Sequence, residues 1–382
     1  MGRAASALIA AVLMLATAAC GSTTLSAARP SPSPSASPSV ATSPSASPSV
    51  VPTASPAPDY GPPPAGVDLF YVQWPAAPTW LIGYDWSGKP RATVHLKELD
   101  AGVDTIGSGI NVAPNGTAFA DGGGSMTFDR LGNLIYQTAP REKGNLISTW
   151  SDEGRLLCGV EEAMSTIDSN GNGTVDYYLT VRPLNGPPVR VKKFLHLDFV
   201  PGDMGYSLAA CSGTLNRALL VRTVCCSIQG AVVLRLTDGA LLGSWNRTGG
   251  QPIFSPDGQE IADPTWTANG NTASTEVRLI LGGTVLARYG PGVVFEAFSG
   301  DNRLAVIKSG SQTQVIQVNS RRVIWRDTTG RTLARAVARP GTGDMVLAFT
   351  IKDQVDSIVV VHADGSSAAI DGQFLVPMSW GY

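Results

Sequence analysis

The feature that most constrains this chain is a repeated pair of apolar segments joined by a tight turn. Seven such turns occur at intervals of about 37 to 54 residues, which is the length of a four-stranded propeller blade. Gly, Asn and Asp build the turns because these residues tolerate the backbone conformations that tight turns need. The turns are Ser87-Gly88, Leu131-Gly132-Asn133, Asn185-Gly186, Asp238-Gly239, Gly282-Gly283, Asn319-Ser320 and Asp364-Gly365. The spacing predicts an all-β domain of stacked, similar units.

A second signature recurs at the other turn of each unit. Its copies are Val112-Ala-Pro-Asn-Gly116, Trp150-Ser-Asp-Glu-Gly154 and Phe254-Ser-Pro-Asp-Gly258, with looser copies at Phe298–Asn302 and Ala338–Gly343. An aromatic residue, Ser-Pro-Asp-Gly and an apolar strand resemble the blade of a TolB-type, WD-repeat-like propeller, and Phe254–Ala262 matches that blade closely. The resemblance implies a propeller in the cell envelope, and it transfers no catalytic residues.

The order of the units predicts how the ring closes. Residues 67–382 contain six complete units and a last strand, Phe374–Trp380, that has no following partners. The segments that begin at Leu69, Trp80 and Ala92 supply the missing three. We therefore predict a seven-bladed propeller with four-stranded antiparallel blades, one of them built from both termini, which leaves no open edge strand. A six- or eight-bladed ring, a sandwich and a solenoid are the alternatives.

The start of the chain has the pattern of a signal peptide over residues 1–19: Arg3, an uncharged run, then small residues. Ala18-Ala19-Cys20-Gly21 resembles a bacterial lipobox, which implies that Cys20 carries a diacylglycerol and anchors the protein to the outer face of the cell membrane. Thr17 stands where the lipobox usually has Leu, so ordinary secretion is the alternative. The excess of Arg over Lys suggests a high-GC genome such as that of an actinobacterium.

Residues 20–66 are dominated by Pro, Ser and Ala. Such a segment cannot bury a core, and its prolines favour extended polyproline II. We expect a disordered tether between the lipidated cysteine and the propeller.

The charge balance excludes one class of partner. The chain has 28 Lys and Arg against 30 Asp and Glu, without a basic run. Nucleic acid is therefore not expected as a partner, and membrane contact is expected through the lipid anchor alone.

One loop resembles the calcium loops of integrin-type propellers and the front of an EF-hand. Oxygen-bearing residues stand at alternate positions around a glycine, and calcium takes six to eight oxygen ligands. The candidate ligands are Asp168, Asn170, Asn172, the backbone carbonyl of Thr174, and Asp176. Leu179 stands where an EF-hand has its Glu. The alternative is a Gly/Asn-rich hairpin that binds no ion, and even a bound calcium is expected to be structural.

The cysteines beyond Cys20 are Cys158, Cys211, Cys225 and Cys226. Four cysteines allow three disulfide connectivities in an oxidising compartment. Cys158 and Cys211 both lie near the second signature in consecutive units, so the register favours a bond between them. Cys225 and Cys226 would then form a vicinal pair or stay free.

Catalytic patterns are largely missing from the sequence. It has no G-x-S-x-G motif, and the three histidines fall in three different units. Long loops gather on one predicted face and carry Trp74, Trp80 and Trp266 as candidate binding residues. We expect a binding or scaffold module for an envelope protein, peptide or glycan. The alternative is a propeller-type lyase, hydrolase or cyclotransferase acting on cell-wall material.

Overall fold

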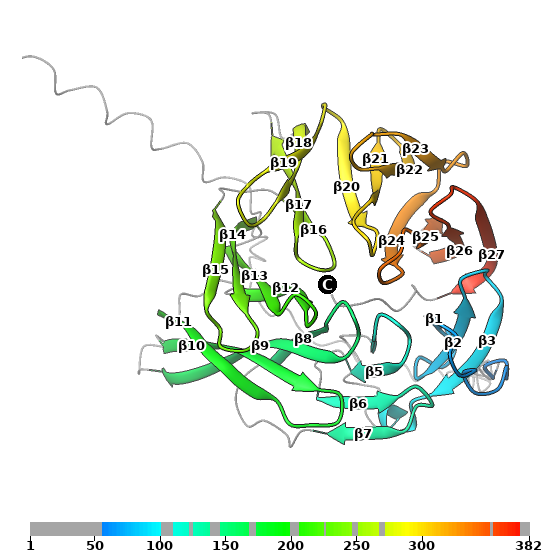
Figure 1. Cartoon of the computed structure of the whole chain (residues 1–382). Helices are drawn as coiled ribbons and strands as arrows, with labels where there is room; N and C mark the ends of the chain where they lie inside the picture. Colours follow the sequence, from blue (N-terminus) through cyan, green and yellow to red (C-terminus); the bar gives the residue numbers. More distant parts are fainter. Residues whose placement is uncertain are drawn as a thin grey trace, which may run out of the picture. The chain divides into compact units, whose positions relative to one another are not determined.

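The computed structural model describes residues 56–100, 110–121, 125–137, 146–167, 173–198, 206–224, 227–246, 251–266, 272–351 and 354–374. These residues form seven antiparallel sheets that are arranged as the blades of a ring (Figure 1). The seven-bladed, all-β fold that the repeats predict is thus confirmed. In this part of the chain no helix is long and apolar enough to cross a membrane.

Each blade is a simple meander, and its strands are called A to D from the centre of the ring outward. Blade 1 contains β1 (Leu69–Gln73), β2 (Trp80–Asp85) and β3 (Pro90–His95). Blade 2 contains β4 (Ile110–Val112), β5 (Ala118–Asp121), β6 (Met126–Asp129) and β7 (Leu134–Gln137). Blade 3 contains β8 (Leu146–Trp150), β9 (Leu156–Ile167), β10 (Gly173–Pro183) and β11 (Val189–Asp198). Blade 4 contains β12 (Tyr206–Ser212), β13 (Arg217–Val224), β14 (Ser227–Arg235) and β15 (Leu241–Asn246).

The remaining blades follow the same order. Blade 5 contains β16 (Ile253–Phe254), β17 (Glu260–Trp266), β18 (Thr272–Leu279) and β19 (Val285–Tyr289). Blade 6 contains β20 (Val293–Phe298), β21 (Leu304–Ser309), β22 (Gln312–Gln317) and β23 (Val323–Arg326). Blade 7 contains β24 (Thr332–Ala338), β25 (Met345–Ile351), β26 (Gln354–Val361) and β27 (Ser367–Phe374).

Both sequence signatures fall at defined places in the blades. All seven turns of the first signature join strands C and D, and the second signature forms the A–B turns. Blade 1 has three described strands, in positions B to D. Residues 375–380, which the sequence assigns to its strand A, lie outside the described residues. The sequence also assigns Phe374 to strand A of blade 1. In the structure Phe374 ends β27 and pairs with Val355 across a register shift. Strand D of blade 7 is therefore longer than the repeat suggests.

Apolar cores lie between neighbouring blades. One buried cluster joins Phe70 and Ile82 of blade 1 to Val346, Ile358 and Val360 of blade 7 and so closes the ring. Sheets that are covered on both faces need continuous apolar strands, which explains why Ile358–Val361 shows no polar alternation. Burial of this apolar surface supplies most of the stabilising free energy of the ring.

The C–D turns also pack one blade on the next. Gly132 of blade 2 and Gly365 of blade 7 have positive φ angles of 87° and 91°. A Cβ on Gly132 would lie 2.7 Å from the carbonyl oxygen of His95, and one on Gly365 would lie 2.5 Å from that of Ile324. Glycine is therefore needed twice, for the turn conformation and for contact with the preceding blade.

Buried serines explain the second signature. The Ser255 hydroxyl accepts the N–H groups of Gln259 (3.1 Å) and Glu260 (2.8 Å) and donates to Asp257 Oδ1 (2.7 Å). Ser151 and Ser299 occupy the same position in blades 3 and 6, and all three serines are fully buried. The motif is thus a turn cap, because its serine and aspartate satisfy backbone groups that the strands leave unpaired.

The A–B turns bond to one another around the ring, and we call this set the A–B belt. Its hydrogen bonds cross six successive blade junctions, from blades 2 and 3 round to blades 7 and 1. They run from Asn115 Nδ2 to the Glu153 carbonyl (3.5 Å), from the Gly213 N–H to Glu153 Oε2 (3.1 Å), from Arg217 Nε to the Asp257 carbonyl (3.2 Å), from Asn302 Nδ2 to Asp257 Oδ2 (3.0 Å), from the Asp301 N–H to the Thr342 carbonyl (3.1 Å) and from Arg339 Nη2 to Asp68 Oδ2 (3.0 Å).

The end of the tether packs on blade 1. Thr93 of β3 donates its N–H to the Gly61 carbonyl (2.8 Å) and its hydroxyl to the Pro58 carbonyl (2.6 Å). Contacts with the propeller therefore begin at or before Pro58, ahead of the expected domain start at residue 67.

Replacing Gly365 with Ala tests the contact between blades. Gly282 is a matched control, because it has a φ of 84° in the same kind of turn but no neighbouring atom within 4 Å of the position that a Cβ would take. We expect Gly282→Ala to cost about 1–2 kcal/mol for the left-handed conformation. Gly365→Ala should cost at least about 1 kcal/mol more, since its Cβ meets the Ile324 carbonyl. Urea unfolding measures both, and equal losses would contradict the packing role.

Candidate functional site: the central cavity

A cavity of about 980 Å³ lies at the centre of the ring. Strands A of blades 2 to 7 line it, and Figure 1 shows β8, β12, β16, β20 and β24 around this centre. The cavity also extends between blades 4 and 5, where Val221, Thr223 and Ile228 contribute. Most of the wall is apolar, and the volume lies at the upper end of the range for small-molecule sites.

A few polar side chains interrupt the apolar wall. They are Asn111, Ser148, Thr149, Asp152, Ser207, Thr223, Gln251, Glu296 and Arg335. The Ser148 hydroxyl and Asp152 Oδ1 are buried, and neither has a hydrogen-bond partner among the described residues. Buried polar atoms without partners are uncommon in native proteins and are often explained by a ligand or water.

Asp152 and its neighbour Glu153 form a hydrogen-bonded carboxyl pair at the A–B end of the cavity. Burial raises the pKa of Asp152 well above its usual range, and the hydrogen bond and negative charge of Glu153 raise it further. Burial alone would also raise the pKa of Glu153, but hydrogen bonds from Asp152, Ser151 and the Gly213 N–H outweigh burial and lower it. The two carboxyls therefore titrate as a coupled pair, which keeps one proton to a higher pH than isolated carboxyls do.

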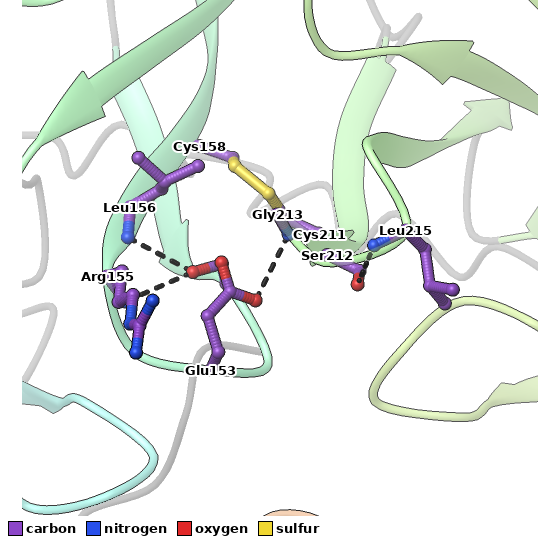
Figure 2. The surroundings of a disulfide bond; sticks show 9 residues. Glu153, Arg155, Leu156, Cys158, Cys211, Ser212, Gly213 and Leu215 are labelled. Atoms are coloured by element: carbon purple, nitrogen blue, oxygen red, sulfur yellow. Dashed lines mark hydrogen bonds between the residues drawn. A yellow bond between two sulfur atoms is a disulfide. The ribbon is translucent and has the colours of Figure 1, made fainter.

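A disulfide lies beside this pair. Figure 2 shows Cys158 of β9 bonded to Cys211 of β12, with Glu153 held by the Gly213 N–H nearby. The two Cα atoms are 6.3 Å apart, and both side chains are buried. The bond joins blade 3 to blade 4, and it is the pairing that the register favours. Cys225 and Cys226 lie outside the described residues.

A second perturbed carboxyl lies in the A–B belt. Burial raises the pKa of Glu260 to about 7, and the negative charge of Asp257 adds to the effect. Glu260 Oε2 is buried without a hydrogen-bond partner among the described residues. The belt therefore contains protonatable groups whose charged forms destabilise the fold.

The expected calcium loop lies at the junction of β9 and β10. Asp168, Asn170 and Asn172 fall outside the described residues, while Thr174 and Asp176 lie in β10. Lys193 Nζ contacts Asp176 Oδ2 at 2.8 Å, so this ammonium group would have to move before that oxygen could bind a cation. No group of three or more His, Cys, Asp or Glu in the described ranges could hold a metal. Calcium binding stays a prediction.

The expected tryptophan face is only partly described. Trp74 packs against the core between blades 7 and 1, and Trp80 stacks on His95 with ring centroids 4.1 Å apart. Trp266 ends β17, and its side chain lies outside the described part. Trp74 and Trp80 are absent from the described lining of the cavity, so the structure does not bring these residues to one site with it.

Sequence reasoning overlooked Arg335 and Asp152. Arg335 is the only charged residue in the segment Thr332–Ala338, and a lone charge in an apolar strand A was the available signal. Asp152 lies inside the repeated A–B turn motif, whose residues have a structural role as a turn cap. Its raised pKa depends on contacts with other blades, which the sequence does not reveal.

Comparisons with known proteins identify no family. No protein-family model matches the chain, and no curated protein sequence matches it. Solved structures show weak likeness. A structure of the eukaryotic initiation factor has a TM-score of 0.42 at 11% identity, covering 84% of this chain and 98% of that one. Saccharomyces cerevisiae Sqt1 has a TM-score of 0.41 at 12% identity, covering 77% and 79%. Likeness at this level carries no argument about function.

Removing the disulfide should weaken the junction between blades 3 and 4. The double variant Cys158→Ala, Cys211→Ala is expected to lose about 2–4 kcal/mol of unfolding free energy, because the bond closes a long loop in the unfolded chain. Urea unfolding without reductant measures the loss. Reductant should destabilise the wild type by a similar amount and leave the variant unchanged. A wild type that is insensitive to reductant would contradict this role.

Glu260→Gln should stabilise the propeller above neutral pH. The folded state binds the Glu260 proton more tightly than the unfolded state, so wild-type stability falls as pH rises from about 4.5 to about 7. The variant removes this loss, with an expected gain of about 1–2 kcal/mol at pH 8 and almost none at pH 4. Unfolding free energies across this pH range test the prediction. Glu98→Gln at an exposed position is the control, and equal pH profiles for Glu260→Gln and the wild type would refute it.

Proposed function

We propose that this protein is a membrane-anchored, extracytoplasmic binding module whose ligand occupies the central cavity. The observation that carries the proposal is the cavity itself, which six blades line and which contains buried polar atoms without partners among the described residues. A rigid, preformed cavity binds a ligand at little conformational cost. The ligand is a protein, peptide or glycan of the cell envelope, or a part of one.

The envelope location rests on sequence and on the disulfide. A signal peptide over residues 1–19, the lipobox-like Cys20 and the tether over residues 20–66 would place the propeller outside the cell, at a distance from the membrane. The buried Cys158–Cys211 bond fits an oxidising compartment. A TolB-like lipoprotein of an actinobacterium would combine these features.

An enzyme is the second candidate function, because of one observation. Asp152 lines the cavity and has a raised pKa, which favours the protonated form that a general acid needs. Such an enzyme would act on cell-wall material as a lyase, hydrolase or cyclotransferase. The described lining contains neither His nor Tyr, so a partner base would have to be Glu296 or come from residues that the structure does not describe.

Cys20→Ala tests the anchor. The variant should move from the membrane fraction to the soluble extracellular fraction, because a stable lipid anchor needs the thiol of Cys20. Fractionation and immunoblotting of intact cells measure the shift. Ser22→Ala, which keeps the cysteine, should stay on the membrane. A Cys20→Ala protein that remains on the membrane would contradict lipidation.

Crosslinking on intact cells tests the binding function. The full-length protein should capture the same envelope component in repeated experiments, and Ala334→Trp, which places a bulky side chain in the cavity wall, should weaken that capture. Purified protein incubated with cell-wall material should leave it unchanged. If the wild type forms a product from cell-wall material and Asp152→Asn does not, the protein is an enzyme and the proposed binding function is wrong.

A further inference from the structure

Arg335 places a cation in the wall of the central cavity. It lies in β24, is partly buried, and lines the cavity together with Leu333 and Val337. Burial lowers its pKa, since removal from water disfavours the charged guanidinium. An arginine at this depth costs free energy unless something pairs with it.

The fold itself does not require a cation at this position. Arg335 belongs to the fourth ladder pair of blade 7, counted back from the Ala338–Met345 pair at the A–B turn. The ladder pairs of blades 6 and 4 are counted in the same way, from the pair whose two residues lie seven positions apart across the A–B turn. The fourth pair then contains Val294 in blade 6 and Ser207 in blade 4. A small apolar or neutral polar residue therefore serves the same place in two other blades.

No partner for the guanidinium occurs among the described residues. The neighbouring arginines differ in this respect: Arg331 Nη2 contacts Asp327 Oδ1 at 2.8 Å, and Arg339 Nη1 contacts Asp344 Oδ2 at 3.2 Å. The Arg335 guanidinium has neither an ion pair nor a hydrogen bond with any described group. Its charge is thus left uncompensated by the part of the chain that the structure describes.

The two acidic side chains of the lining do not cancel this charge. Glu296 Oε1 lies 2.9 Å from Lys308 Nζ, so that carboxylate already has a cationic partner. Asp152 is hydrogen-bonded to Glu153, and burial together with this neighbour raises the pKa of Asp152. Arg335 is therefore the only cation of the described lining, and neither carboxyl of that lining pairs with it.

We propose that the central cavity binds a monoanionic ligand, an apolar body that ends in one carboxylate, and that Arg335 binds the carboxylate. A guanidinium pairs with both oxygens of a carboxylate through two parallel hydrogen bonds. The apolar side chains of the inner strands would pack against the body of the ligand, and the Ser148 hydroxyl and Asp152 are available for further hydrogen bonds. This inference rests on the proposed binding function, because it names the chemistry of the ligand in the same cavity.

A dianionic phosphate fits the cavity less well. One arginine neutralises a single negative charge, and a second charge in an apolar cavity would remain desolvated without a partner. The carboxylate itself has two sources, a free organic acid or the C-terminus of a polypeptide. A fatty acid and a short peptide, used as separate probes, distinguish these sources.

Calorimetric titration of the full-length Cys20→Ala chain tests the proposal. The probes are octanoate and an N-acetylated tripeptide that ends in Ala-Leu with a free carboxylate. Octanol and the same tripeptide with a C-terminal amide are their uncharged counterparts, and octyl phosphate is the dianion. We expect one or both carboxylates to bind at least about tenfold more tightly than their uncharged counterparts, because a charge-assisted pair contributes more than a neutral hydrogen bond. Binding of octanoate but not of the peptide would indicate a free organic acid as the ligand. Binding of the peptide but not of octanoate would indicate the C-terminus of a polypeptide.

Arg335→Met separates a binding role from a structural one. The variant should lose at least about tenfold in carboxylate affinity and, without ligand, should unfold at a higher temperature than the wild type, since it removes an unpaired buried charge. Arg326→Met, on the outer strand β23, is the matched control and should change neither property. Ala334→Trp keeps Arg335 but narrows the cavity beside it, and it should weaken carboxylate binding by at least about tenfold.

Titrations of the wild type and of Arg335→Met would overturn the inference in three cases. They are equal affinity for carboxylates and uncharged counterparts, unchanged carboxylate affinity in Arg335→Met, or tighter binding of octyl phosphate than of octanoate. If Arg335→Met destabilises the fold, Ala334→Trp still decides the matter, because a carboxylate affinity that it leaves unchanged would place the ligand elsewhere. The proposed function fails separately, when crosslinking captures no reproducible envelope component. If Arg335→Met still captures the envelope component, the proposed binding function stands and only the inference of a carboxylate ligand is refuted.

Discussion

Contact between neighbouring blades is the constraint on which the rest of this structure depends. A four-stranded blade cannot bury its two apolar faces alone, so each blade must pack on the next until the ring closes. Apolar clusters such as that of Phe70, Ile82 and Val346 supply the driving force. The A–B belt then orients each blade through bonds such as that from Asn302 Nδ2 to Asp257 Oδ2. The Cys158–Cys211 disulfide adds a covalent link to one junction.

Closing the ring also creates the cavity and sets its chemistry. Strands A of six blades line a space that their side chains do not fill. Groups that would be solvated on an isolated blade are buried there, which raises the pKa of Asp152 and leaves the Arg335 guanidinium without a partner among the described residues. Natural proteins tolerate such destabilising groups where function needs them. The central cavity is therefore a more specific candidate site than the outer loops that carry Trp74 and Trp80.

Most of the fold could be predicted because each blade is specified locally. Turns such as Asp364-Gly365 need particular dihedral angles, and the Ser-Pro-Asp-Gly motif caps a turn through neighbouring backbone groups. The site could not be predicted in the same way. Ser148 and Asp152 come from blade 3 and Arg335 comes from blade 7, and nothing in their local sequence distinguishes a cavity wall from a packed core. The Cys158–Cys211 pairing was accessible because both residues stand beside a repeated motif in consecutive blades.

The sequence by itself determined the repeat, the order of strands and the positions of the turns, since these follow from local periodicity and turn chemistry, and it favoured seven blades over six or eight. It also carries the signal peptide pattern and the lipobox-like Cys20, which act through local sequence. The tertiary structure alone decided which side chains face the centre and which of them lack partners in the described part of the chain. Burial and pairing depend on groups from six different blades, so the raised pKa of Asp152 and the isolation of the Arg335 guanidinium exist only in the closed ring.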